Sequence, residues 1–285
     1  MSGAGSEPGT SASLNGTASG VAPSGPAGGA TSGSAAAASP SYASLDLFDL
    51  GRRAAEARNG RLGGAWASFV RSRQLLSTGA WRGPRDASES FVEAADLSAV
   101  GGWAAAQAAG VTLLIGGGEN STAVDGASPD LLASHVAAAG AGGRSLWRFP
   151  YVAGEPAAER RARLEALRDL ARRSDLALWG ALPTPIGEPQ GLDTLHLIAT
   201  LRLELPEIAH VALDVAALGP RLAQMALGFG ADELWAPIVS ERALRLGANA
   251  KNPAMTRKEA IVLIRGAGLV PRERTGPEAY SEESP

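Results

Sequence analysis

Short apolar runs alternate with amphipathic stretches along most of the chain. The runs predict strands at residues 66–70, 111–115, 145–152, 176–182, 210–215 and 233–238. Helical spacing of apolar residues predicts helices at 45–58, 91–109, 129–139, 155–173, 192–205, 220–229 and 256–265. Strands that alternate with helices are typical of a parallel sheet. The pattern therefore predicts an α/β fold, an incomplete TIM-type (β/α) barrel of about six strand–helix units, in which the strands at 111–115, 176–182, 210–215 and 233–238 are parallel neighbours or near neighbours.

Two helices carry clear start signals. Pro156 opens the helix at 155–173, and Leu164, Leu167 and Ala171 line one face of it. Thr256 and Glu259 have the spacing of a capping box, which predicts that a helix begins there.

Composition divides the chain at about residue 40. Residues 1–40 are almost wholly Gly, Ser, Ala, Thr and Pro, with Glu7 as their one charge. Such a segment has too little apolar surface to offset its loss of conformational entropy, so we expect a disordered tail. It has neither the basic nor the apolar region of a secretory signal. Residues 41–285 have the length of one α/β domain.

Charge and cysteine content exclude several classes of protein. The net charge is –3 with mixed signs, so nothing favours binding to nucleic acid or to an anionic membrane surface. No apolar run has the ~20 residues that cross a bilayer. The chain has no cysteine and hence no disulfide, which is compatible with a cytoplasmic location. We expect a cytoplasmic protein that binds neither nucleic acid nor membrane.

A family resemblance rests mainly on residues 191–247. The matching residues are Ile198-Ala199, Arg202-Leu203, Ile208, His210, Leu218-Gly219, Leu222-Ala223-Gln224, Ala226-Leu227 and Phe229-Gly230-Ala231-Asp232. The closing segment 264–274, IRGAGLVPRER, adds to the match. The chain resembles the radical SAM enzymes of futalosine-type menaquinone biosynthesis, aminofutalosine synthase and cyclic dehypoxanthine futalosine synthase. That resemblance implies a barrel fold, a [4Fe–4S] cluster on three cysteines and cleavage of S-adenosylmethionine.

The cluster chemistry is where this chain departs from the family. The family's C-x-x-x-C-x-x-C positions fall on Trp81, Arg85 and Ser88, none of which supplies a thiolate. The three histidines lie on separate predicted elements, without metal-site spacing. We therefore expect no iron–sulfur cluster and an ordinary loop, with Trp81 packed and Arg85 solvated. A pseudoenzyme is the favoured interpretation.

A glycine-rich loop follows the strand predicted at 111–115. Gly116, Gly117, Gly118 and Glu119 resemble the family's GGE loop, which holds the methionine end of the cofactor. Glycines there let a ligand approach backbone N–H groups, and a carboxylate can bind an amine. The alternative is a flexible turn without a ligand. Binding of S-adenosylmethionine is thus one of two interpretations, and the loop marks the barrel mouth in both.

Other predicted strand ends supply candidate substrate-binding residues. Asp214 follows the strand at 210–215, whereas Thr184 and Glu188 lie in a Pro-rich loop after the strand at 176–182. The resemblance implies substrate contacts in that loop, although an ordinary loop is the alternative. Asp232 begins its strand, which favours a structural role. Between 119 and 145 the chain is too short for the family's further strand–helix units, so we expect a deletion.

Three functions stay open at this point. The chain is a non-catalytic ligand-binding or partner protein related to menaquinone biosynthesis, a cluster-independent enzyme that uses carboxylates such as Asp214 and Glu119, or a structural interaction protein. A ligand site would lie at the barrel mouth between the 116–119 loop, Asp214 and the 183–188 loop, because parallel strands direct the loops that follow them to one rim. The alternative is that side chains have filled the mouth.

Overall fold

The computed structural model describes residues 45–117, 129–239, 254–276 and 279–282. The tail predicted to be disordered, 1–40, lies outside these residues, as do Gly118 and Glu119. No helix within the described residues is long and apolar enough to span a membrane.

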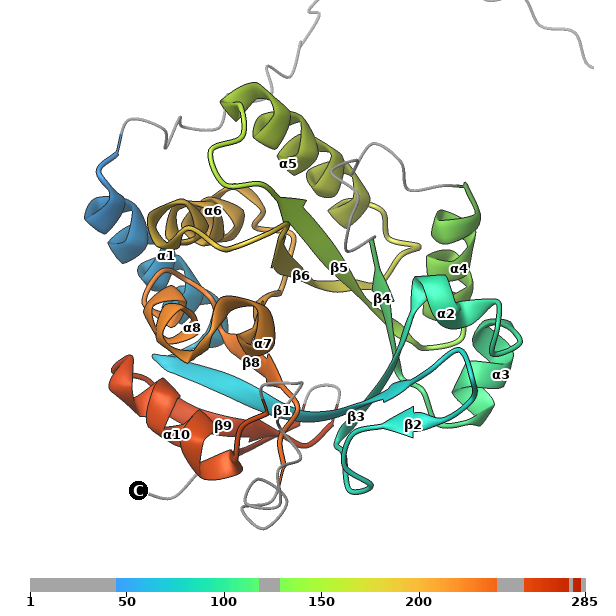
Figure 1. The fold of residues 1–285 in the computed structure, drawn as a ribbon. Coiled ribbons are helices and arrows are strands. Elements are labelled where there is room, and N and C mark those ends of the chain that lie inside the picture. The colour runs from blue at the N-terminus through green and yellow to red at the C-terminus, as the bar shows by residue number, and fades with distance from the viewer. Residues whose placement is uncertain (1–44, 118–128, 240–253, 277–278, 283–285) are drawn as a thin grey trace, which may run out of the picture. The chain divides into compact units, whose positions relative to one another are not determined.

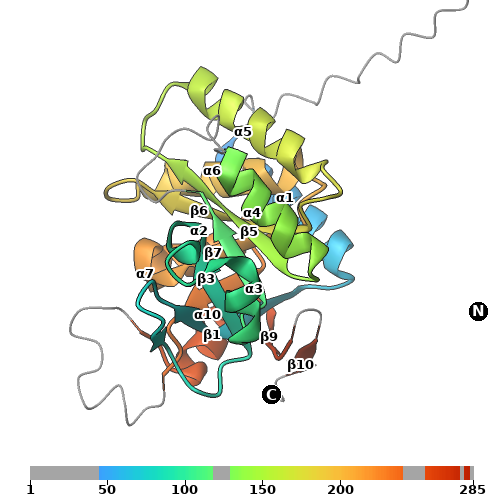
Figure 2. The same cartoon turned by 90° about the vertical axis from the view of Figure 1, so that its right-hand side faces the viewer.

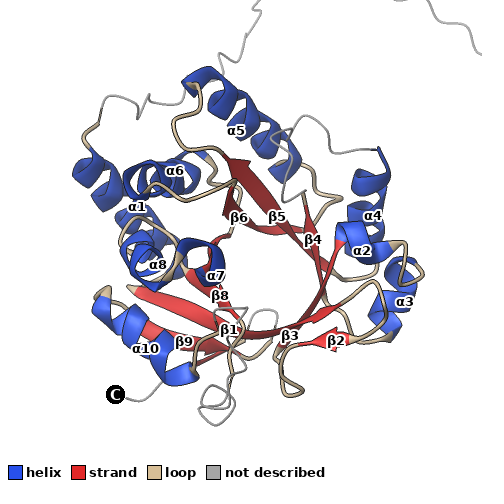
Figure 3. Cartoon of the chain, in the orientation of Figure 1, coloured by secondary structure: helices blue, strands red, loops and turns tan. Residues whose placement is uncertain are grey.

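Seven parallel strands close into a barrel (Figures 1 and 3). In barrel order they are β1 (Trp66–Leu75), β3 (Glu89–Glu93), β4 (Leu113–Gly116), β5 (Arg144–Tyr151), β6 (Leu178–Pro185), β7 (His210–Asp214) and β8 (Glu233–Ala236). Pairing of β8 with β1, in register from Ser68 opposite Glu233, closes the ring. The predicted fold class, an incomplete TIM-type barrel, is confirmed, and so is the parallel arrangement of the strands predicted at 111–115, 176–182, 210–215 and 233–238.

The predicted count of six strands is one too low, because β3 was predicted as the start of a helix. Glu89, Phe91 and Glu93 alternate with Ser90 and Val92, which is the two-residue period of a strand. β3 pairs in parallel with both β1 and β4. The apolar residues on both sides of Glu93 have a spacing that also fits a helix. The helix predicted at 91–109 was therefore wrong over its first residues.

Helices cover the outside of the barrel. Figure 2 shows α3 and α4 in front of the barrel strands and α5 above them. The helices are α1 (Leu47–Leu62), α2 (Ala94–Leu97), α3 (Gly102–Ala108), α4 (Pro129–Gly140), α5 (Ala157–Ala171), α6 (Gly191–Glu204), α7 (Val215–Leu218), α8 (Pro220–Leu227) and α10 (Arg257–Gly266). The capping box predicted for Thr256 and Glu259 is present at the start of α10.

Three further strands lie beside the barrel wall: β2 (Trp81–Arg82), β9 (Val270–Arg274) and β10 (Tyr280–Glu282). β9 runs parallel to the first half of β1, and β3 runs parallel to its second half. Both lie on the same edge of β1, because the Ala65 and Arg71 carbonyls point the same way and accept from Val270 and Ser88. β3 therefore begins where β9 ends, which brings Arg274 to an opening in the wall.

The main apolar core fills the space between the strands and the outer helices. A second cluster of buried apolar residues faces inward from the strands, and it includes Val70, Leu113, Ile115, Leu146, Leu182, Ala212 and Trp235. These two clusters are the two faces of one sheet. Side chains of the second cluster define the barrel interior.

Candidate ligand cavity in the upper half of the barrel

Alternation along the strands arranges the barrel interior in three layers. Each strand places one inward residue near its start, one in its middle and one near its end. The sequence triplets are Glu89-Phe91-Glu93 in β3, Arg144-Leu146-Arg148 in β5 and His210-Ala212-Asp214 in β7. The interior is therefore charged at the bottom, apolar in the middle and charged again at the mouth.

Arg274 is the centre of the lower layer. It is fully buried and binds Glu233 through two hydrogen bonds, Nε to Oε2 at 2.7 Å and Nη2 to Oε1 at 3.0 Å. Its Nη1 also forms an ion pair with Glu89, which pairs in turn with Arg144. Two carboxylates and two guanidinium groups thus neutralise each other, and of the four side chains only that of Arg144 has appreciable contact with solvent, at 13% exposure.

Trp179 completes this layer through a bulge in β6. The register between β5 and β6 shifts by one residue at this point, so that Trp179 has no counterpart on β5. Its ring stacks on His210 with centroids 4.3 Å apart, and the guanidinium of Arg274 lies 4.7 Å from its centroid. The bulge redirects a large side chain into a space that regular alternation would leave to a smaller one.

Nearby charges lower the pKa values of two buried carboxylates, Glu89 and Asp232. Burial by itself would raise the pKa of Glu89, but Arg274 and Arg144 outweigh it and hold that pKa below its usual value. Burial opposes ionisation of Asp232 as well, yet Arg202 at 2.7 Å and His210 at 2.6 Å lower its pKa. Asp232 also accepts from the Val211 amide, which confirms its predicted structural role.

The middle layer forms an aromatic floor. Trp235 and Phe91 meet edge to face with ring centroids 5.5 Å apart. The indole N–H of Trp235 donates to Glu233 in the layer below. The floor is therefore fixed to the ionic layer beneath it by a hydrogen bond.

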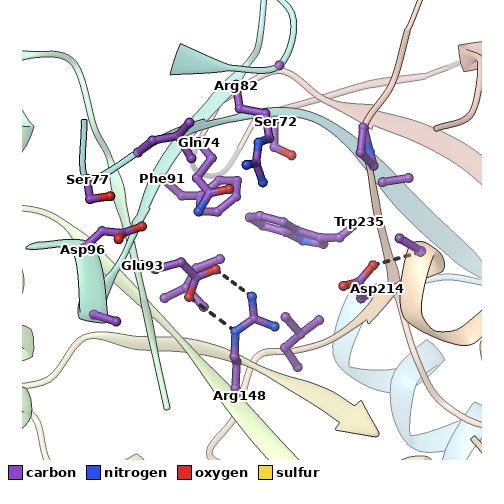
Figure 4. Close-up of a pocket in the computed structure, with 18 of the residues that line it drawn as sticks. Ser72, Gln74, Ser77, Arg82, Phe91, Glu93, Asp96, Arg148, Asp214 and Trp235 are labelled. Atoms are coloured by element: carbon purple, nitrogen blue, oxygen red, sulfur yellow. Dashed lines mark hydrogen bonds and ion pairs between the residues drawn. The ribbon is translucent and has the colours of Figure 1, made fainter. Parts of the chain in front are cut away.

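Above this floor lies a cavity of about 750 Å³. Each of the seven barrel strands contributes at least one described lining residue, and Figure 4 shows how the main ones surround the space. From the strands these are Ser72, Gln74, Phe91, Glu93, Ile115, Arg148, Leu182, Asp214, Trp235 and Ala236. A cavity of this size is in the range of small-molecule sites. It lies at the carboxyl ends of the strands, where barrel proteins bind their ligands.

The polar groups of the cavity are partly engaged with each other. Arg148 donates to Glu93, with Nη2 to Oε1 at 2.6 Å and Nε to Oε2 at 3.4 Å (Figure 4). Asp214 caps α7 by accepting from the Ala216 and Ala217 amides at 2.9 and 3.3 Å. Arg82 lines the same cavity from β2 and has no hydrogen-bond or ion-pair partner among the described residues.

The glycines predicted to bind a cofactor have different surroundings. A Cβ atom on Gly116 would lie 2.2 Å from Nε2 of the buried His135, so this glycine makes room for a side chain outside the barrel. Gly117 lines the cavity, has φ of +85° and passes close to the Arg148 backbone. Cofactor binding by these residues stays a prediction, with only Gly117 at the cavity within the described part of the loop.

The predicted substrate-binding residues do not all meet at this cavity. Asp214 belongs to its lining. Thr184 is buried and donates to the Leu182 carbonyl at 3.0 Å, and Glu188 is exposed to solvent. Neither of these two is among the described lining residues. Their role in binding a substrate stays a prediction.

The residues at the family's cluster positions do not fit an iron–sulfur cluster. Trp81 is partly buried against the core, with the Arg73 guanidinium 4.1 Å from its ring centroid, and Arg85 is exposed. Ser88 donates to the Arg274 carbonyl at 2.6 Å. The expected packing of Trp81 and solvation of Arg85 are confirmed. These three side chains offer no thiolate for iron.

Arg274, Glu89, Trp235 and Arg148 were not singled out from the sequence. The signal that could have found Glu89 and Arg148 is the alternation of charged and large apolar residues at every second position of ESFVE and RSLWR. A charged residue at both ends of a short strand, with a large apolar residue between, indicates an inward face that is polar at both ends. Arg274 has no such local signal, because its position depends on how β9 meets β3.

Comparison with known proteins gives partial similarity over one stretch. No family model matches the chain. It is 32% identical over 84 residues to aminodeoxyfutalosine synthase of Thermus thermophilus, which covers 30% of this chain and 23% of that protein. It is 34% identical over 86 residues to 5-amino-6-(D-ribitylamino)uracil–L-tyrosine 4-hydroxyphenyl transferase 1 of Methanosarcina barkeri, which covers 30% of this chain and 23% of that protein. The match thus spans about a quarter of each relative's length, and it supports a distant relation to radical SAM enzymes.

Proposed function

We propose that this chain is a distant relative of radical SAM enzymes that binds a small molecule in the upper half of its barrel and does not cleave S-adenosylmethionine reductively. The observation that carries the proposal is the cavity of about 750 Å³, lined from all seven strands at their carboxyl ends. This cavity counts against the alternative that side chains have filled the barrel mouth. Similarity to aminodeoxyfutalosine synthase supports a place in menaquinone biosynthesis within the same proposal.

The residues that line the cavity indicate which chemical groups the ligand carries. Phe91 and Trp235 present apolar ring surface at the floor, while Ser72, Gln74 and Arg82 provide hydrogen-bonding groups on one wall. A flat ring with polar substituents matches both. Nucleosides and S-adenosylmethionine carry such a ring, and they are the first compounds to test. We propose that the protein binds this ligand in the cytoplasm and has neither nucleic acid nor membrane as a partner.

A non-catalytic role is supported by the chemistry of the residues. The chain has no cysteine, so it cannot hold a [4Fe–4S] cluster on three thiolates as the family does. Glu93 is occupied by Arg148, and Asp214 by two backbone amides of α7. Carboxylates held in this way serve to shape a site, and a general base would have to give up these partners first.

The test is calorimetric titration with adenosine and with S-adenosylmethionine. Asp214→Ala is compared with Asp46→Ala, because Asp46 caps α1 through the same pair of bonds, at 2.9 and 3.0 Å, and is not among the described lining residues. Each change removes the side-chain cap of a helix, so both should lower the stability modestly. Binding should weaken in Asp214→Ala and stay unchanged in Asp46→Ala. Equal affinities in both variants, or no binding to the wild type, would contradict the proposal.

Gly117→Val gives a second variant at the opposite wall. A Cβ on Gly117 would lie 2.9 Å from the Arg148 carbonyl oxygen, so the change crowds the cavity wall. Gly63→Val is its control, since Gly63 also has positive φ, at +69°, with nothing within 4 Å of an added Cβ. Both glycines have positive φ, at +85° and +69°, so a valine is strained at either position. The ligand should lose affinity for Gly117→Val alone.

A further inference from the structure

Trp235 is the large side chain of the cavity floor, and its orientation depends on one hydrogen bond. Its ring is 6% exposed, meets Phe91 edge to face and donates its indole N–H to Oε1 of Glu233. The N–H is the polar handle of an otherwise apolar ring. The direction of this bond fixes which face of the indole is turned to the cavity.

Glu233 is itself held from several sides. Its side chain is fully buried. Oε2 accepts from the Ser68 hydroxyl at 2.9 Å and from Arg274 Nε at 2.7 Å, while Oε1 accepts from Arg274 Nη2 at 3.0 Å and from Trp235. A carboxylate with this many donors has one orientation. Arg274 thereby ties the cavity floor to β9, outside the ring of seven strands.

We propose that Glu233 is the positioning residue of the ligand site, which holds the Trp235 ring as a preformed flat surface against which the ligand packs. The inference rests on the proposed function, since it assigns a role within the same cavity. Its physical basis is preorganisation: a ring already held in its bound orientation loses no rotational freedom when the ligand arrives. Arg274 acts one step further away, because its two hydrogen bonds to Glu233 hold that carboxylate in its orientation.

Glu89 provides a matched control for Glu233. Both carboxylates lie in the lower layer, both are almost fully buried and both pair with Arg274. Glu89 accepts from Thr112, Arg144 and Arg274, and the Trp235 indole donates to Glu233 instead. Glu89→Gln and Glu233→Gln therefore disturb the same ionic layer, but only the second acts on the indole directly.

The first measurement needs no ligand. The ¹⁵N-labelled protein has six tryptophan indole signals, of which Trp235→Phe identifies one. We expect that signal to show a downfield proton and slow exchange with solvent, as a bond to a carboxylate dictates. Glu233→Gln should shift it upfield and speed its exchange, whereas Glu89→Gln should leave it in place. Equal shifts in the two variants, or no shift in Glu233→Gln, would overturn the proposal.

The second measurement uses adenosine and S-adenosylmethionine as probes. Glu233→Gln should weaken the binding of a probe about tenfold, as expected for a hydrogen bond to a charged group. Glu89→Gln should change it by less than about twofold. A loss that is the same in both variants would mean that the layer acts only through stability, which overturns a positioning role.

The two measurements separate this inference from the proposed function. If neither probe binds the wild-type protein, the proposed function fails, while the indole signal still decides whether Glu233 orients Trp235. If Glu233→Gln does not fold, the exchange rate of the Trp235 indole proton in wild-type protein decides instead. Slow exchange supports the proposal, and rapid exchange of this nearly buried group contradicts it.

Discussion

The lower and upper halves of the barrel interior are built from the same strands, yet one half is closed and the other is open. In β3, Glu89 is buried in an ionic layer, whereas Glu93, four residues further on, lines a cavity of about 750 Å³. The difference arises from two side chains that regular alternation does not supply. Arg274 enters the lower half from β9, and the bulge in β6 adds Trp179.

This contrast shows what decides whether a barrel interior becomes core or pocket. Seven strands leave room inside, and the strands' own alternating residues do not fill it in the upper half. In the lower half, Arg274 from β9 and Trp179 from the bulge in β6 fill this space instead. Function is then restricted to the end without such extra filling, which is also the end where parallel strands deliver their following loops.

Removal of Arg274 should have the largest effect on stability. Arg274→Ala leaves Glu233 and Glu89 buried without their shared cation, and breaking a buried pair in this way costs about 3–5 kcal/mol. Arg52→Ala is the control, because Arg52 pairs with Asp49 and Glu56 at the exposed surface, where solvent screening leaves an ion pair little effect on stability. Urea unfolding measures both. Similar losses in the two variants would mean that the lower layer is not a closed ionic core.

Acid should weaken the lower half first. The pKa values of Glu89 and Asp232 lie below their ordinary values of 4.5 and 3.8 in the folded protein. Their contribution to stability is therefore complete above those ordinary values, and it is lost as pH falls through the lower pKa values of the folded state. Urea midpoints measured from about pH 6 to about pH 3 should fall steeply below about pH 4.5 in the wild type. A similar slope in Glu89→Gln would contradict this assignment.

A smaller effect tests whether Gly116 belongs to the wall or to the mouth. Gly116→Ala should cost about 1–3 kcal/mol, because the new methyl group would overlap His135 and Trp147 outside the barrel. Gly60→Ala in α1 is the control, with nothing within 4 Å, and should be neutral or stabilising. Thermal unfolding of the two variants compares them. Loss of ligand binding in Gly116→Ala without loss of stability would mean that Gly116 acts in ligand binding and not in packing of the wall.

Much of the architecture could be predicted from local pattern, and the closure of the barrel could not. The strands at 111–115 and 233–238 are clear in the sequence because both of their faces are buried, which gives a short apolar run. The helix at 155–173 is clear because it buries one consistent face. β3 was missed because the strand is only five residues long, so its two-residue alternation is brief, and because helix-forming alanines follow it. The closure follows from the pairing of β1 with β8, which joins residues far apart in the chain and leaves no local signal.

The location of the candidate site was predicted better than the residues that line it. Asp214 and Gly117 line the cavity, as expected for loops after parallel strands, but Thr184 and Glu188 are not among the described lining residues. Arg148 and Glu93 stayed hidden because an ion pair across two strands shows only when register is known. Trp235 looked like an ordinary core residue, and its role at the floor depends on the open space above it.

The absence of cysteine allows a direct test of the contrast between the two halves. Ser68 and Ser72 both lie on β1, where Ser68 bonds to Glu233 in the lower layer and Ser72 lines the cavity. In otherwise cysteine-free protein, Ser72→Cys and Ser68→Cys each introduce a single thiol for labelling by a small charged methanethiosulfonate. We expect the thiol at 72 to react in the folded state and the thiol at 68 only on global unfolding. Protection of both thiols would mean that the mouth is filled, and rapid reaction of both would mean that the lower half is not closed.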